Sequence, residues 1–172
     1  GLQHATRYFW RVAASNAGGP SLFSPSRRFT TIVAVPAAPV LLSPPDGVSG
    51  IQTNPVLAWH RSAQADTYRV QLSADSLFST SVLDTTVADS SIQLSNLQPG
   101  TLYYWHVTAS NAGGPSAYSL RWRFATLPLP PPVPTLTSPA DAAAAVSTTP
   151  AYTWNSVAGA SFYRRQVATD TN

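Results

Sequence analysis

The chain contains 172 residues and carries a formal charge of +3 from ten arginines and seven aspartates, with no lysine, glutamate, cysteine or methionine. The absence of cysteine excludes a fold held by disulfides, so an apolar core has to stabilise each folded unit. The arginines are spread along the chain instead of gathered in one segment, which argues against nucleic-acid binding, and no apolar run reaches the roughly 20 residues of a membrane-spanning helix.

The chain repeats itself with an offset of 95 residues. When residues 1–77 are aligned with residues 96–172, 33 of the 77 positions are identical and no gap is needed. A period of this length fits a β-sandwich of about 100 residues. The repeat predicts five segments: the last two strands of a first copy at 1–31, a linker at 32–39, a complete copy at 40–126, a second linker at 127–134, and the first three strands of a third copy at 135–172.

Alternating apolar and polar residues predict the strands of the complete copy. The first strand places Leu41 inward and is followed by a turn at 43–47. Phe78 is expected to fill the core after the third strand. The remaining strands are expected at 56–60, 67–73, 82–86, 91–94, 103–110 and 118–126.

Residues 97–116, LQPGTLYYWHVTASNAGGPS, show the pattern most clearly. A turn at Pro99-Gly100 precedes a strand in which every second residue is apolar, and Gly113-Gly114-Pro115 ends the strand, with both glycines expected at positive φ. SNAGGPS recurs near the start of the chain, from Ser15 to Ser21. The residues expected in the core are Trp59, Tyr68, Tyr103, Trp105, Val107 and Phe124.

A leucine, a Pro-Gly-Thr turn, a Tyr-x-Trp-x-Val-x-Ala strand and an Asn-x-Gly-Gly loop stand between Leu97 and Gly114, and this series resembles the F strand and F–G loop of a fibronectin type III domain. Through the repeat, the resemblance covers the whole chain. It implies an all-β protein of tandem fibronectin type III-like (immunoglobulin-like) β-sandwiches of the bacterial extracellular type, one complete and two partial. It also implies that Tyr103 makes the corner hydrogen bond of such sandwiches. Some family members bind adhesion receptors through an acidic tripeptide in the F–G loop, which this chain lacks.

The second linker reads LPLPPPVP from Leu127 to Pro134, and its five prolines predict an extended polyproline II spacer of about 3.1 Å per residue. A docking ligand of the PxxP type is the alternative interpretation, but a proline-rich stretch at a repeat boundary favours a linker. The partial copies at the two ends lack the strands they need to close a core. We therefore expect them to associate with each other, and the stiff proline linker favours association between chains over folding back within one chain.

The sequence predicts no catalytic residue, no cofactor and no metal site. The aspartates form no dense cluster of oxygens such as a calcium site needs. Asp46 is expected to form a turn, and Asp75 and its counterpart Asp170 are expected to accept hydrogen bonds from nearby backbone amides. The histidines lack metal-binding spacing and are expected at the surface: His4, His60 and His106.

Tyr104 and Trp122 are expected to be exposed aromatics, and with His106 they are the candidate ligand-facing residues. The family resemblance and the lysine-free composition favour a non-catalytic structural spacer or interaction module of a larger secreted or cell-surface protein. The expected partners are neighbouring repeats and, at a cell surface, a protein or glycan; neither nucleic acid nor membrane insertion is expected. The alternative is a carbohydrate- or receptor-binding adhesion module that uses these aromatics.

Overall fold

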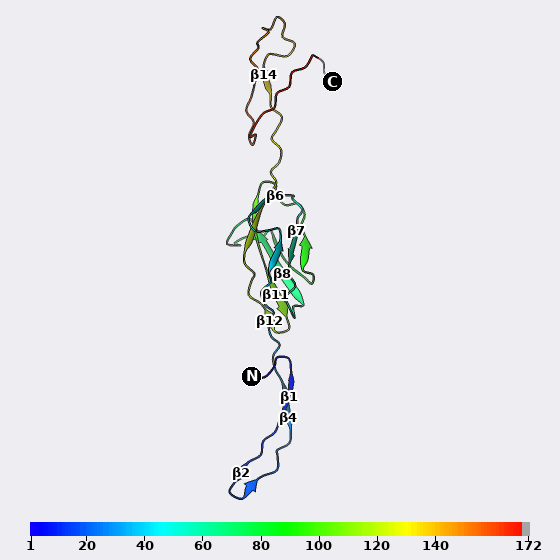
Figure 1. The fold of residues 1–172 in the computed structure, drawn as a ribbon, viewed down its shortest axis with the longest axis vertical. Helices are drawn as coiled ribbons and strands as arrows, with labels where there is room; N and C mark the ends of the chain where they lie inside the picture. The colour runs from blue at the N-terminus through cyan, green and yellow to red at the C-terminus, as the bar shows by residue number, and fades with distance from the viewer. Residues whose placement is uncertain (170–172) are drawn as a thin grey trace. The chain divides into compact units, whose positions relative to one another are not determined.

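The computed structural model describes residues 1–169, which form strands and connecting segments without a helix (Figure 1). They divide into two compact units, Gly1–Leu127 and the residues from Pro128 onward. Since every described element is a strand, the prediction of an all-β fold is confirmed. No helix in the described part of the chain has the length and apolar character to cross a membrane.

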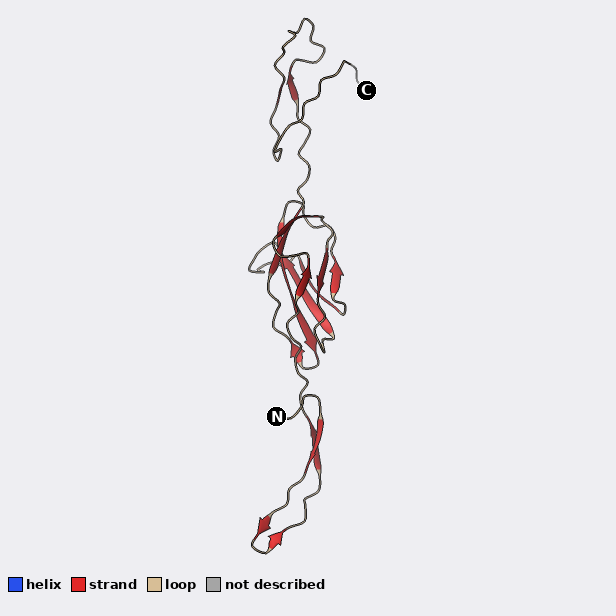
Figure 2. Ribbon diagram, in the orientation of Figure 1, coloured by secondary structure: helices blue, strands red, loops and turns tan. Residues whose placement is uncertain are grey.

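The central part of the first unit is a sandwich of two sheets (Figure 2). The smaller sheet has the order β10-β7-β5. The larger sheet has the order β6-β13-β11-β8-β9, with the short strand β12 beside β11. The strands in chain order are β5 (Leu41–Ser43), β6 (Val48–Ile51), β7 (Val56–Trp59), β8 (Thr67–Ser73), β9 (Leu83–Val87), β10 (Ser91–Gln93), β11 (Leu102–Asn111), β12 (Gly114–Pro115) and β13 (Trp122–Thr126).

An apolar core lies between the two sheets because the strands of each sheet turn alternate residues toward the other. In β11 the four apolar residues of the alternation, Tyr103, Trp105, Val107 and Ala109, are all buried. One aromatic pair joins the two sheets, with the ring centroids of Trp59 in β7 and Tyr68 in β8 5.5 Å apart. Another joins the neighbouring strands β11 and β13, with the centroids of Tyr103 and Phe124 5.8 Å apart. The six predicted core residues all lie in this cluster: Trp59, Tyr68, Tyr103, Trp105, Val107 and Phe124.

Tyr103 makes the corner hydrogen bond that the family resemblance implies. Its hydroxyl oxygen accepts from the backbone N–H of Gln98 at 2.9 Å, and the ring packs in the core. The first copy contains the same contact, because the Gln3 N–H donates to the Tyr8 hydroxyl at 2.9 Å. The hydrogen bond fixes the turn before β11 against the strand itself.

Tyr103→Phe is expected to lower the free energy of unfolding of the central sandwich by about 1 kcal/mol, since it leaves the Gln98 amide without its acceptor but keeps the ring. Urea denaturation followed by circular dichroism measures the loss. Tyr8→Phe is the matched control and should leave that transition unchanged. Equal effects of the two substitutions would contradict the assignment of the corner to the central core.

The last strand of the sandwich is shorter than the sequence predicts, since β13 begins at Trp122 and not near Tyr118. The preceding segment still runs beside β11, but serine side chains replace its backbone carbonyls as acceptors. The hydroxyls of Ser116 and Ser119 accept from the amides of Ala109 and Val107 at 3.0 and 3.1 Å. The sequence also does not predict β6, which follows the predicted turn directly and pairs in parallel with β13.

Residues 1–31 form a hairpin in which β1 (Arg7–Trp10) pairs with β4 (Arg27–Thr30) and β2 (Ser15–Asn16) pairs with β3 (Gly19–Pro20). Its register follows the central copy, because Tyr8 faces Phe29 as Tyr103 faces Phe124. Most of its large side chains are exposed, in contrast with the central copy: Trp10 is 49% accessible and Trp105 is fully buried.

In the second unit, β14 (Leu136–Ser138) pairs with β15 (Thr153–Trp154). The third strand predicted for this copy is not formed in residues 128–169. Its counterpart in the central copy, β8, lies between β11 and β9, and the described part of this unit offers no such neighbours. One local contact is kept: the Val157 N–H donates to the Tyr163 hydroxyl at 2.8 Å, as the Ser62 N–H does to Tyr68 at 2.9 Å.

Candidate functional site

The candidate site is the outer face of the larger sheet, and it contains two of the three predicted ligand-facing residues. Tyr104 and His106 lie on this face of β11, each partly exposed. Trp122 does not, and its prediction as an exposed aromatic is wrong. It stands directly opposite Trp105 across the β11–β13 pair, so it shares the inward face, and the two rings meet edge to face with centroids 6.3 Å apart.

His106 is enclosed by two rings whose position on this face the sequence does not predict. Phe78 stacks on one side of the imidazole, with centroids 4.1 Å apart and planes 3° apart. Tyr118 stacks on the other side at 4.0 Å and 22°. Phe78 therefore covers the outside of the sheet instead of filling the core as predicted. We call Phe78, His106 and Tyr118 the ring stack.

A polar chain leads from the ring stack across β8 to β9. The imidazole Nε2 of His106 lies 2.8 Å from Oε1 of Gln71, and the amide Nε2 of Gln71 donates to Asp84 at 2.9 Å. Because Gln71 offers its oxygen to the ring, Nε2 of His106 carries the proton. Asp84 also accepts two hydrogen bonds from Arg69, at 2.7 and 2.6 Å, and these hold the pKa of Asp84 below its usual value.

Burial between the two rings lowers the pKa of His106, and the charges of Arg121 and Arg69 lower it further, against a smaller opposing effect of Asp84. Histidine in the unfolded chain titrates near pH 6.5. Between the folded-state and unfolded-state pKa values the unfolded chain binds more protons, so the free energy of unfolding rises with pH. We expect the stabilisation from neutral His106 to be complete above about pH 6.5 and to be lost as pH falls through the folded-state pKa.

Urea denaturation of the full chain between pH 7.5 and pH 5 tests this dependence. His106→Gln should reduce the change of the free energy of unfolding with pH in that window. His60→Gln, at an exposed histidine of the same sandwich, should leave that pH dependence unchanged. An unchanged pH dependence of the free energy of unfolding in His106→Gln would contradict the prediction. Asp75 and Asp84, whose pKa values are lowered, lose their contributions only below about pH 4, outside the window.

Beside the ring stack, Tyr104 lines a polar groove of about 380 Å³ with Asp46, Ser76, Arg121 and Arg123. The Arg121 guanidinium carbon lies 5.5 Å from the centre of the Tyr104 ring, and its Nη1 donates to the carbonyl of Ser76 at 2.6 Å. Asp46 accepts from the backbone N–H of Arg123 at 2.9 Å, so it ties the turn before β6 to β13. Guanidinium groups beside an aromatic ring can bind a hydroxyl-rich or anionic group.

The carboxylate of Asp75 serves the loop after β8, as its position predicts. It accepts from the amides of Leu77 and Ser79 at 3.0 and 2.9 Å, and these hydrogen bonds lower its pKa. Its counterpart Asp170 lies outside the described residues. Within residues 1–169, no three His, Cys, Asp or Glu side chains are grouped to hold a metal ion.

Comparison with solved structures finds several fibronectin type III proteins. The FN1–FN3 domains of chicken CNTN1 are 22% identical with a TM-score of 0.46, and the alignment covers 73% of this chain and 44% of that one. An Fn3-like protein from Clostridium thermocellum is 19% identical with a TM-score of 0.41, and the coverage is 56% and 96%. FN3tt is 24% identical with a TM-score of 0.41, covering 54% and 98%. This chain thus spans less than half the length of the chicken structure, and no curated protein matches it.

Comparison with protein families matches residues 43–123 to the fibronectin type III domain. The matched range contains both sheets apart from residues 41–42 of β5 and 124–126 of β13. It includes the turn before β11, the tyrosine corner and the β11–β12 turn, on which the resemblance in the sequence rests. The central sandwich, with two sheets around one apolar core, therefore has the fold of a fibronectin type III domain.

Proposed function

We propose that this chain is a non-catalytic spacer and interaction module that joins sandwich units in series within a larger secreted or cell-surface protein. The observation that carries the proposal is the ordered connection in front of the central sandwich. The side-chain amide of Asn111, at the end of β11, donates to the carbonyl of Ala34 in the linker at 2.9 Å. A linker held in this way gives consecutive units a defined spacing. The fibronectin type III match supports the secreted or cell-surface location.

The second linker tests the spacer role, because a polyproline segment sets distance without joining a core. The chain has no cysteine, so spin labels can be placed at Ala74→Cys and Ala151→Cys alone. Deleting residues 129–132 is expected to shorten the mean label distance by up to about 12 Å, at about 3.1 Å per residue. Replacing Pro130, Pro131 and Pro132 with glycine keeps the length and should broaden the distance distribution. Loss of stability of the central sandwich in either variant would mean that the prolines pack into a core.

The second candidate function is recognition of a glycan or protein receptor by the outer face. It is supported by the exposed side of Tyr118 in the ring stack and by the groove at Tyr104, where two arginines offer donors. The full chain on a glycan array tests it, with Tyr118→Ala and Arg121→Ala expected to remove any signal. Trp122→Ala is not a suitable binding variant, because Trp122 packs against the core.

A further inference from the structure

The turn at the end of β11 holds the linker that precedes the central sandwich. We call residues 110–116 the central SNAGGPS turn. Within it, the Asn111 side-chain oxygen accepts from the Gly113 N–H at 2.8 Å, which closes the turn. The Asn111 side-chain nitrogen donates at 2.9 Å to the carbonyls of Ala34 and Gln64. One side chain thus connects the linker, the turn and the loop between β7 and β8.

Gly113 explains why the linker can lie so close to the turn. A Cβ atom at this position would be closer to the carbonyl oxygen of Val33 than real contacts allow, and it would be 3.0 Å from the carbonyl carbon. The positive φ of 120° belongs to Gly114, so backbone conformation does not explain Gly113. Glycine is needed at 113 because another backbone passes directly over it.

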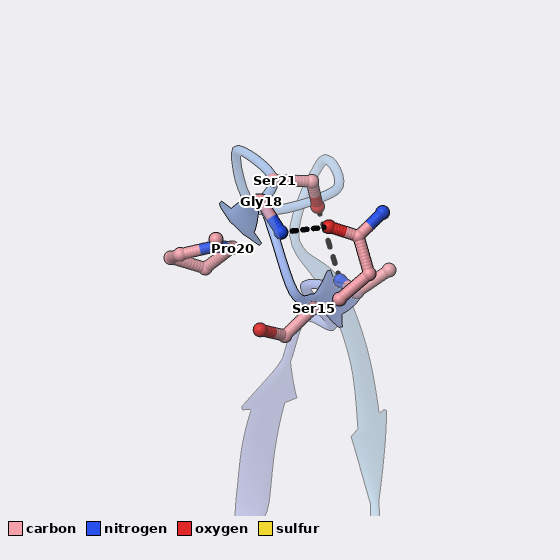
Figure 3. Close-up of a pocket in the computed structure, with 7 residues that line it drawn as sticks. Ser15, Gly18, Pro20 and Ser21 are labelled. Carbon is pink, nitrogen blue, oxygen red and sulfur yellow. Dashed lines mark hydrogen bonds between the residues drawn. The ribbon is translucent and has the colours of Figure 1, made fainter.

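The first copy repeats this turn with the same seven residues at 15–21, and here the place of the linker is an open hollow of about 330 Å³ (Figure 3). The turn is closed in the same way, because the Gly18 N–H donates to Asn16 at 2.8 Å. Among residues 1–169, and leaving out Gly18 and its two chain neighbours, the only atom that a Cβ on Gly18 would meet within 4 Å is the side-chain oxygen of Asn16, at 3.2 Å. Among residues 1–169, Asn16 accepts through its side-chain oxygen and its side-chain nitrogen has no acceptor, and no backbone beyond the chain neighbours comes within 4 Å of a Cβ on Gly18.

We propose that the SNAGGPS turn is a binding site for the extended segment that precedes each sandwich unit, and that the hollow at residues 14–21 binds such a segment. Its occupant has the chemistry of Val33–Val35: an extended backbone whose carbonyl accepts from Asn16, with apolar side chains small enough to lie over the turn. Glycine at position 18 leaves room for that backbone. The inference rests on the proposed serial arrangement of units, and it identifies the contact between linker and turn that fixes this arrangement.

The first test uses the full chain with spin labels at Ser26→Cys in the hairpin and Ala74→Cys in the sandwich. Gly113→Ala and Asn111→Ala should broaden the label distance distribution roughly twofold, because the freed linker samples many conformations. Gly18→Ala is the matched control and should leave the distribution unchanged. Circular dichroism checks that the central sandwich remains folded. A folded Gly113→Ala variant with an unbroadened distance distribution would overturn the proposal that the turn binds the linker. It would not affect the spacing test on residues 129–132.

The second test supplies the missing occupant by adding residues 32–95 ahead of Gly1. Gly1 is equivalent to Asn96 in the 95-residue register, so the addition completes a unit whose turn is residues 15–21. With one label at the first residue of the added linker and one in the completed unit, Gly18→Ala should now broaden the distance distribution as Gly113→Ala does in the central unit. A completed unit that fails to fold, or one in which Gly18→Ala has no effect, would overturn the assignment of the hollow.

Discussion

Trp105→Ala is expected to destabilise the central sandwich by about 3–5 kcal/mol. The ring has no solvent exposure and lies on the central strand of the larger sheet, between Leu72 of β8 and Trp122 of β13. Removing it leaves a cavity that the surrounding strands cannot fill, since each is fixed by its neighbours. Because domains of this size have only about 5–15 kcal/mol of stability, much of the protein should be unfolded at moderate urea.

Equilibrium urea denaturation followed by far-ultraviolet circular dichroism measures this loss. Tyr104→Ala is the matched control, because it removes a large ring from the next residue of the same strand but from the outer face. We expect it to cost about 1 kcal/mol or less, since Tyr104 is partly exposed and contributes mainly its contact with Arg121. Similar costs for the two substitutions would contradict the inward and outward assignment of β11.

The inward residues of β11 could be predicted from sequence because a strand has a fixed period of two. Once Tyr103 is inside, Trp105, Val107 and Ala109 follow, and the structure places all of them in the core. The repeat strengthens the prediction, since the first copy keeps the same residues at the same spacing. Period and repeat together identify the fold of the central copy and its main core side chains.

Trp122 could not be placed in this way, although it belongs to a strand. Its repeat partner is Arg27, which suggests a solvent-facing position. That comparison is misleading because the hairpin of the first copy has no closed core, so Arg27 does not show whether this position faces inward. The prediction that Phe78 fills the core is wrong for a different reason. Phe78 follows β8 in a loop, at a positive φ of 56°, where no periodicity relates side-chain direction to sequence.

The two glycines of the SNAGGPS turn show a further limit of local reasoning. Turn chemistry predicts positive φ for both, but only Gly114 adopts it. Gly113 is required by the approach of Val33, which is distant in the sequence and carries no motif of its own. The same turn at residues 15–21 is open, so identical sequences differ in their contacts according to what lies over them.

Trp59→Ala is expected to cost about 3–5 kcal/mol, whereas Trp154→Ala at the equivalent position of the next copy should leave the unfolding of the central sandwich unchanged. Both rings pack on a tyrosine, with centroid distances of 5.5 Å to Tyr68 and to Tyr163. The difference lies in what covers them.

Trp59 is 2% exposed in a core closed by the opposite sheet, and its strand neighbour Leu41 is also buried. Trp154 stays partly exposed, and its strand neighbour Leu136 is 77% accessible. Acrylamide quenching adds a second readout, because Trp154 should be quenched in the folded protein and Trp59 should be protected until the sandwich unfolds. If Trp154→Ala destabilised the central sandwich as much as Trp59→Ala, the assignment of that core to residues of the central copy alone would be wrong, since burial and not the aromatic pair supplies most of the stabilisation.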